Sequence, residues 1–260
     1  EVKTPDRLNE RQFARWCMLY CRAADKLFKD MLYTEQLDRA LAWCKNHGTA
    51  EQRAWMGLYL GRSYVKDKLF IPAMKAYSDA LSLAKEKYLY DVAGYICSYM
   101  ADLYTYTGQR SEERRKFEEA AEFFKQAGNE RSYAFALRDV AKTWAFDDSL
   151  SLALHYMLIA DSVITRFQDL RGISSISNGL GNIYDLMGDV EKARAYYSRS
   201  LSSDTMDQVP SYLALSDLYY NESLLDSARY YLALATGPSL NPYTSVSYTH
   251  LRAHETGRNL

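Results

Sequence analysis

Polar residues of a few types recur at matching places along this chain, and their types suit binding of a carboxylate or a peptide backbone. Arg138 and Lys142 are four residues apart, so on a helix they share one face, one turn apart. Asn178 and Asn182 hold the same two places 40 residues later. Arginine binds a carboxylate through two parallel bonds, and asparagine offers both donor and acceptor groups. The alternative is that Arg138 pairs with Asp102 or with another acid across the same surface.

Residue groups typical of catalysis have simpler structural explanations in this chain. Gly179 and Gly181 lack the third glycine of a dinucleotide fingerprint, and they lie inside a helical pattern rather than after a strand. Asp147 and Asp148 are expected to cap a helix, and isolated histidines such as His47 are more often structural than catalytic. No HExxH, Walker glycine loop or nucleophile elbow occurs. We therefore expect no catalytic residue, no cofactor and no metal, and we predict that the protein is not an enzyme.

The four cysteines, Cys17, Cys21, Cys44 and Cys97, form no CxxC motif. Cys17 and Cys21 are one helical turn apart, which suits neither a relaxed disulfide nor a four-ligand zinc site without nearby histidines. We predict that they are buried free thiols, because unpaired cysteine is among the most buried residue types.

The charge pattern argues against nucleic acid as a partner. The 260 residues carry 32 Lys and Arg against 33 Asp and Glu, a net charge of -1, with both signs interspersed. Nucleic-acid binding normally requires a basic stripe that neutralises phosphates. The densest charge run, residues 112–116, is expected to be a solvated helix face, with Lys116 on the surface away from any binding groove. No apolar run approaches the ~18 residues that a membrane-spanning helix needs.

Residues of one type recur every 40 positions, and these columns organise the elements that must position the polar residues. Small residues recur at Ala40, Ala80, Ala120, Ala160 and Ser200. Aromatic residues recur at Tyr64, Tyr104, Trp144 and Tyr184, and a second small column at Gly61, Ala101, Ala141 and Gly181. Small residues at helical offsets let two helices cross closely while aromatic side chains fill the space beside the crossing. The columns therefore predict a helical repeat protein.

The pattern resembles the tetratricopeptide repeat (TPR). The first clear unit carries the likeness at Leu60, Gly61, Tyr64, Ala73, Tyr77 and Ala80, and the last at Leu215, Ser216, Tyr219, Ala228, Leu232 and Ala235. Clear repeats span about residues 54–236, and a degenerate repeat spans about residues 14–47. Two features depart from the family: Glu113 stands where a small residue is usual, and the period is longer than the standard 34 residues.

The resemblance implies an all-α fold, a right-handed TPR superhelix (α-solenoid) of about six helix pairs over residues 1–245. The helices expected are 7–29, 34–46, 50–66, 70–86, 89–107, 110–127, 130–146, 149–167, 170–187, 190–203, 209–221 and 224–236. Left-handed glycines are expected to close helices at Gly48, Gly108, Gly128 and Gly188. Short polar side chains are expected to cap second helices at Thr34, Asp148 and Asp189.

Residues 246–260 resemble the translated read-through of a sequencing adapter, so we expect a non-native tail that contributes nothing to folding. This interpretation removes His250 and His254 from any metal site. The chain also begins at Glu1 without an initiator Met. We expect both natural ends to be missing, together with any signal, transmembrane helix or output domain that they carried.

In the family that the chain resembles, first helices line a concave groove that binds peptides. Carried over by repeat register, the groove positions include Trp55, Lys66, Tyr95 and Asp185. Within that set, the residues assigned to peptide binding are Arg62, Asp102, Phe135, Arg138, Lys142, Phe146, Asn178, Asn182 and Asp217. Arg138, Lys142, Asn178 and Asn182 are expected to converge on one patch, and the two phenylalanines to supply apolar walls. The arrangement does not reproduce the chaperone-binding carboxylate clamp of some relatives.

The function that follows is a non-enzymatic TPR module that binds a protein or peptide segment in its concave groove. The 40-residue style of repeat resembles bacterial TPR sensor-regulators, which are often exported and membrane-tethered. An extracytoplasmic sensor arm is therefore the favoured role, with membrane attachment only through segments missing from the fragment. The alternative is a cytoplasmic assembly scaffold or co-chaperone-like adaptor. The uninterrupted gene on both flanks would discriminate between them.

Overall fold

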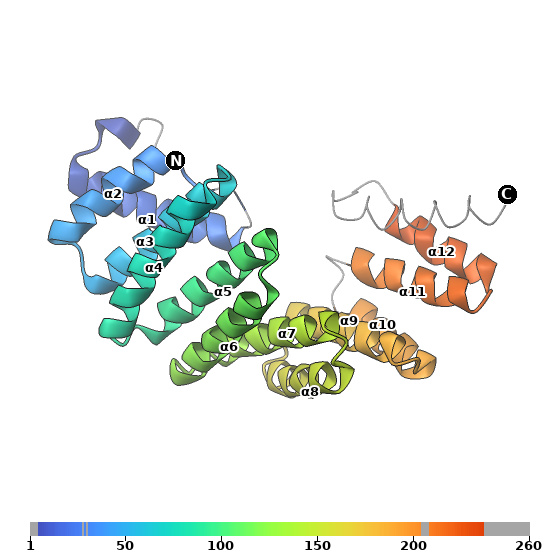
Figure 1. The fold of residues 1–260 in the computed structure, drawn as a ribbon. Coiled ribbons are helices and arrows are strands. Elements are labelled where there is room, and N and C mark those ends of the chain that lie inside the picture. Colours follow the sequence, from blue (N-terminus) through green and yellow to red (C-terminus); the bar gives the residue numbers. More distant parts are fainter. Residues whose placement is uncertain (1–4, 28, 30, 204–207, 237–260) are drawn as a thin grey trace. The chain divides into compact units, whose positions relative to one another are not determined.

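The computed structural model describes residues 5–27, 29, 31–203 and 208–236, so the predicted tail lies outside the described residues. Within those ranges the protein is all-α, with one short 3-10 helix, Pro5–Arg7, and twelve α-helices (Figure 1). The helices are α1 (Glu10–Lys26), α2 (Thr34–His47), α3 (Ala50–Lys66), α4 (Phe70–Glu86), α5 (Tyr90–Thr107), α6 (Arg110–Gln126), α7 (Glu130–Phe146), α8 (Leu150–Arg166), α9 (Leu170–Leu186), α10 (Val190–Ser203), α11 (Val209–Asn221) and α12 (Leu225–Ala235). The predicted all-α fold is confirmed. All predicted helix ends agree to within one residue except those of α1, which is shorter at both ends than predicted.

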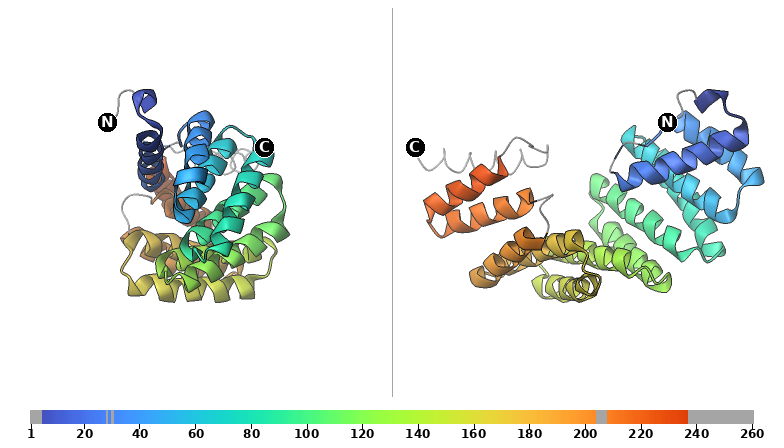
Figure 2. Two further views of the ribbon diagram at one scale, coloured as in Figure 1. Left: turned by 90° about the vertical axis from the view of Figure 1, so that its left-hand side faces the viewer. Right: turned by 180° about the vertical axis from the view of Figure 1, so that it is seen from behind.

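The chain divides into two compact units, Glu1–Ala136 and Leu137–Leu260, hereafter unit 1 and unit 2, with the boundary inside α7. In unit 1 each helix from α1 to α5 packs on the next, and the first helices α1, α3 and α5 also pack on one another in order. In unit 2, α9 packs on α10 and on α11 (Figure 2). Links of three residues, such as 67–69, make successive helices antiparallel. This is the packing of an α-solenoid, in which each helix pair buries its apolar face on its neighbours.

The packing columns predicted from the sequence lie in the core. Ala40, Ala120 and Ala160 are fully buried, and Ala80 and Ser200 nearly so. Helices without such small residues at their crossings would be held further apart.

The second small column varies together with its partner on the second helix. A Cβ atom added to Gly61 would lie 2.3 Å from Cε1 of Tyr77, and one added to Gly181 would lie 2.4 Å from Cε1 of Tyr197. Where alanine replaces this glycine, at position 101 or 141, the partner 16 residues later is Phe or Met. The tyrosine rings therefore occupy space that only a glycine leaves open.

The turns between helices recur every 20 residues, and only some of them contain a glycine. Left-handed backbone recurs at Lys68, Tyr88, Gly108, Gly128, Asp148, Gln168 and Gly188, and again at Ser223. At the first of these turns, Leu69 donates from its backbone N to the carbonyl oxygen of Tyr64 at 2.8 Å, which closes α3 in the usual helix-ending motif. The left-handed roles predicted for the three glycines of this series are confirmed. For Gly48 the prediction is wrong: its φ of −89° and ψ of 159° are extended, because the chain passes directly into the N-terminal cap of α3.

Two of the predicted helix caps are also wrong. Asp148 occupies a left-handed turn, and the N-cap residue of α8 is Ser149. Thr34 bonds through its hydroxyl to Ser63 and Asp67, each at 2.9 Å, instead of capping α2. Asp189 does cap α10, because its carboxylate accepts from the backbone N of Lys192 at 3.1 Å.

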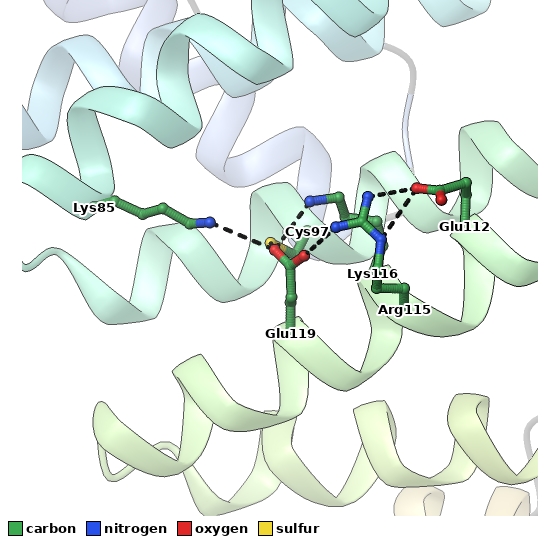
Figure 3. Close-up of polar contacts among 6 residues, drawn as sticks. All are labelled: Lys85, Cys97, Glu112, Arg115, Lys116 and Glu119. Carbon is green, nitrogen blue, oxygen red and sulfur yellow. Dashed lines mark hydrogen bonds and ion pairs between the residues drawn. The ribbon is translucent and has the colours of Figure 1, made fainter.

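The charge run on α6 was predicted to be a solvated helix face, but one of its residues is buried. Lys116 is only 6% exposed, and its Nζ lies 2.9 Å from Oε2 of Glu119 (Figure 3). Lys85 approaches the same carboxylate at 3.5 Å. Arg115 does form the expected pairs within the helix, with Glu112 and Glu119. Lys116 is buried because its side chain follows the packed face of α6 to reach Glu119.

All four cysteines are buried free thiols, as predicted. Cys97 lies beside the α6 charge group, with its Sγ 3.8 Å from Oε2 of Glu119. Burial raises the pKa of the Cys97 thiol to about 12, so the group stays protonated at neutral pH. A protonated, buried thiol is a packing residue rather than a nucleophile.

Candidate functional site

The predicted groove residues lie on first helices, as expected from the repeat register, but they divide between the two units. Arg62, Asp102 and Phe135 belong to unit 1. Arg138, Lys142, Phe146, Asn178, Asn182, Asp185 and Asp217 belong to unit 2.

In unit 1, Arg62 links three first helices. Its guanidinium forms an ion pair with Asp25 of α1 and lies 4.5 Å above the ring centre of Tyr99 on α5. The Tyr99 hydroxyl donates to the same carboxylate at 2.9 Å. Burial raises the pKa of Tyr99, and the negative charges of Asp25 and Asp102 raise it further. Arg62 thus has a structural partner, while Asp102 is exposed on α5.

On the unit 2 part of α7, Arg138 is held by its neighbour in sequence. Its Nε and Nη2 each donate to a carboxylate oxygen of Asp139 at 2.9 Å, and its Nη1 donates to Oγ of Ser175 on α9 at 2.9 Å. The Nζ of Lys142 lies 3.2 Å from the same aspartate. Burial acts to raise the pKa of Asp139, but the charges of Arg138 and Lys142 outweigh it and hold that pKa below its usual value. The group of three carries one net positive charge, and the Lys142 side chain is half exposed.

On α9, Asn178 is fixed by a ladder of serine hydroxyls. Its Nδ2 donates to Oγ of Ser211 on α11 at 3.1 Å. Ser211 donates to Ser200 on α10 at 2.8 Å, and Ser200 lies 2.9 Å from Ser174 on α9. The three serines are buried, so the ladder satisfies their hydroxyls and orients the Asn178 amide.

Next to it, Asn182 lies in an acidic part of unit 2. Its Oδ1 accepts from the buried hydroxyl of Tyr197 at 2.9 Å. Burial raises the pKa of Asp185 and of Asp217, and the charge of Asp185 raises that of Asp217 further. Both carboxylates also raise the pKa of Tyr197, after burial itself, so the four groups are neighbours. Within the residues that the structure describes, neither aspartate side chain forms an ion pair or hydrogen bond.

Two of the predicted residues bond to the next first helix along the chain. Arg138 reaches α9 at Ser175, and Asn178 reaches α11 at Ser211. Phe146 is 70% exposed, whereas Phe135 is half-buried, with Arg131 stacked over its ring in unit 1. Their role as paired apolar walls stays a prediction.

Sequence reasoning missed the partners of these residues: Asp25, Asp139, Ser175 and Ser211. One feature of the sequence, the spacing between paired polar residues, could have revealed some of them. Three polar links between successive first helices join residues 37 apart, namely Asp25–Arg62, Tyr95–Ser132 and Arg138–Ser175. A search for donor and acceptor pairs at this spacing would have found Ser175.

Known proteins resemble the chain in fold but not in sequence. No family model matches it, and no curated protein matches it significantly. The apo form of RapI matches with a TM-score of 0.70 at 16% identity, over 94% of this chain and 70% of RapI. NprR in complex with its cognate peptide NprX matches at 0.64 and 17% identity, over 88% of this chain and 67% of NprR. A Podospora anserina protein with nearly identical TPR-like repeats matches at 0.54 and 14% identity, over 78% of this chain and 96% of that one.

These likenesses and the helix pairs define the fold, which is a TPR-type α-solenoid. No described helix is long and apolar enough to cross a membrane. The part of the chain covered by the structure contains no cluster of three or more His, Cys, Asp or Glu side chains arranged to hold a metal ion.

Proposed function

We propose that the protein binds an extended peptide segment on the first helices of unit 2. The observation that carries the proposal is the pair of bonds that tie these first helices together: Arg138 of α7 donates to Ser175 of α9, and Asn178 of α9 donates to Ser211 of α11. Lys142, Asn182 and Asp217 lie on the same three helices. Groups held in place before binding lose less entropy when a ligand arrives. NprR, whose fold is similar, was solved with its cognate peptide.

The charges of this surface suggest the polarity of the peptide. The α7 group of Arg138, Asp139 and Lys142 is positive, and the side chain of Lys142 is its exposed member. Asp185 and Asp217, on α9 and α11, are acidic. A peptide with a carboxylate toward Lys142 and a basic group toward the two aspartates would complement both ends. Arg138 then serves mainly to position Lys142 and Ser175, because Asp139 already neutralises it.

Peptide selection tests the proposal. Random octapeptides displayed on phage are selected on the wild-type protein, and calorimetry then measures the affinity of the winners for variants. Lys142→Gln and Asp217→Asn should each weaken binding by about 10-fold or more, the equivalent of a charged hydrogen bond. Lys192→Gln is the matched control, because Lys192 lies on second helix α10 and pairs with Asp189. If the Lys142→Glu, Asp217→Lys double variant enriches the same peptides as wild type, the proposal fails.

We further propose that peptide binding makes this chain the sensor arm of a bacterial regulator, outside the cytoplasm and tethered to the membrane through segments other than residues 1–260. The alternative is a cytoplasmic assembly scaffold or adaptor. Sequencing the gene through both flanks tests the choice. A signal sequence with a downstream membrane helix and output domain supports the sensor, and an uninterrupted gene with neither supports the scaffold.

A further inference from the structure

A cavity of about 860 Å³ opens between α1, α2 and α3, entirely within unit 1. Its apolar lining includes Ala14 and Met18 of α1 and Cys44 of α2. This volume is in the range of ligand pockets, which combine apolar walls with a few polar groups. None of the groove positions of unit 2 contributes to it.

Three arginines of α1 line this cavity as one row. Arg11, Arg15 and Arg22 are 4 and 7 residues apart, so they share one helix face and their backbone positions span about 16 Å. Throughout the described residues, none of these three guanidinium groups forms an ion pair or hydrogen bond. Arg39 and Arg62 of unit 1, by contrast, are paired, with Glu10 and Asp25. The lining contains one carboxylate, Glu51, so the cavity carries excess positive charge.

Aromatic side chains of α2 and α3 also line the cavity. Trp43 and His47 of α2 stack with ring centres 5.0 Å apart and an interplanar angle of 16°. Trp55 of α3 is half-buried and packs 5.5 Å from the ring centre of Tyr95. The N-terminus of α3 also borders the cavity, and its capping box begins at Thr49. The positive end of the helix dipole adds to the attraction for anions.

We infer that this cavity is a second binding site, which takes an extended acidic peptide segment of a partner protein with an aromatic or aliphatic residue among its acids. An extended chain of about five residues covers the 16 Å of the arginine row. A single small anion would reach only part of the row. The stacked Trp43 and His47, together with Trp55, supply the apolar contact that a purely ionic ligand would leave unused. The site lies within unit 1 and does not depend on the function proposed for unit 2.

Fluorescence anisotropy with a labelled peptide of sequence EEFEELEE tests this inference on the full chain. The wild-type protein should bind the peptide, and affinity should fall as salt is raised because the contacts are ionic. Arg15→Gln and Arg22→Gln should each weaken binding by about 10-fold or more. Lys26→Gln is the matched control: it removes one charge from the same helix, but Lys26 does not line the cavity. All these side chains are exposed, and thermal unfolding by circular dichroism verifies that each variant is folded.

Four results would overturn the inference. The first is no binding of EEFEELEE by the wild-type protein. The second is an Arg15→Gln, Arg22→Gln double variant that binds as well as Lys26→Gln. The third is binding of the basic peptide KKFKKLKK as tightly as EEFEELEE, or displacement of labelled EEFEELEE by an eight-residue oligothymidylate at a lower concentration than by unlabelled EEFEELEE. Displacement by the oligothymidylate would indicate a nucleic-acid site. The fourth is loss of EEFEELEE binding in the Lys142→Gln variant, which would place the peptide in unit 2. Failure of the phage selection in unit 2 leaves these expectations unchanged.

Discussion

Two helix pairs, α3 with α4 and α9 with α10, share the same core but differ in their polar surface. In both pairs a glycine faces a fully packed tyrosine, with 120 residues between equivalent positions. The next residue after each glycine differs: Arg62 binds Asp25 and stacks on Tyr99, whereas Asn182 accepts from Tyr197. The packing columns therefore hold one scaffold, while the residue beside them sets the chemistry of each surface.

The two units also differ in the sign of their unsatisfied charge. Unit 1 holds the arginine row of α1, which has no acid partner among the described residues. Unit 2 holds Asp185 and Asp217, whose pKa values are raised by burial. One repeat architecture thus offers a basic surface in unit 1 and, in unit 2, a surface with a positive group on α7 and acids on α9 and α11, and the two would favour different peptides.

The largest expected effect concerns the shared core. Tyr77→Ala and Tyr197→Ala should each lower the free energy of unfolding by about 3–5 kcal/mol, because each ring is only 1% exposed and its removal leaves a cavity. Urea denaturation measures both. The control is Tyr230→Ala, where the side chain is 61% exposed and the change should be below about 0.5 kcal/mol. A cost that differs severalfold between the two core tyrosines would break the equivalence of the pairs.

A second variant tests why glycine stands opposite tyrosine. Gly181→Ala should cost about 1–3 kcal/mol, since the new methyl group would overlap the Tyr197 ring. The Gly181→Ala, Tyr197→Met double variant copies the pair found at positions 141 and 157, so it should lose less stability than the sum of the single changes. Chemical denaturation of all four proteins completes the cycle. Strict additivity would show that the two positions do not compete for space.

The polar difference between the pairs should appear when hydroxyl groups are removed. Tyr99→Phe removes a bond to the charged Asp25 and should cost about 1.5–3 kcal/mol. Tyr197→Phe removes a bond to the neutral Asn182 and should cost about 0.5–1.5 kcal/mol. Both rings stay in place, so urea denaturation compares the bonds alone. The contrast is refuted if Tyr197→Phe proves the more costly change.

The smallest effects concern two aspartates of unit 2 and have opposite signs. The pKa of Asp217 is raised above its usual 3.8, so its ionised form destabilises the fold at neutral pH, and Asp217→Asn should stabilise by less than about 1 kcal/mol. That gain should shrink as pH falls toward 3.8, where the wild-type carboxyl is protonated in the fold. The pKa of Asp139 is lowered, so its contribution is present above 3.8 and is lost as pH falls through the lower folded value. Asp139→Asn should therefore destabilise at pH 7. Thermal melts from pH 3 to 7 would contradict this account if both variants shift in the same direction.

The repeat columns were predictable because packing leaves a strong periodic record. Positions such as Ala120 and Gly61 must stay small wherever two helices cross closely, so the period of 40 residues appears in residue types alone. The 20-residue spacing of the turns was less visible in the sequence, because Lys68, Tyr88 and Gln168 adopt left-handed backbone without being glycine. There the short link between two packed helices imposes a conformation that local preference disfavours.

The sequence by itself determined the helices, their order in pairs and the buried small and aromatic columns, because these depend on periodic hydrophobicity and side-chain volume. Only the tertiary structure decided which polar groups meet. Arg138 finds Asp139 and Ser175, Lys116 is drawn into the packed face of α6, and the arginines of α1 are left facing a cavity. Charged side chains are long and flexible, and they can reach partners on their own helix, as Lys116 does, or on another helix, as Arg138 does at Ser175. The choice among partners therefore depends on distances that the order of residues does not contain.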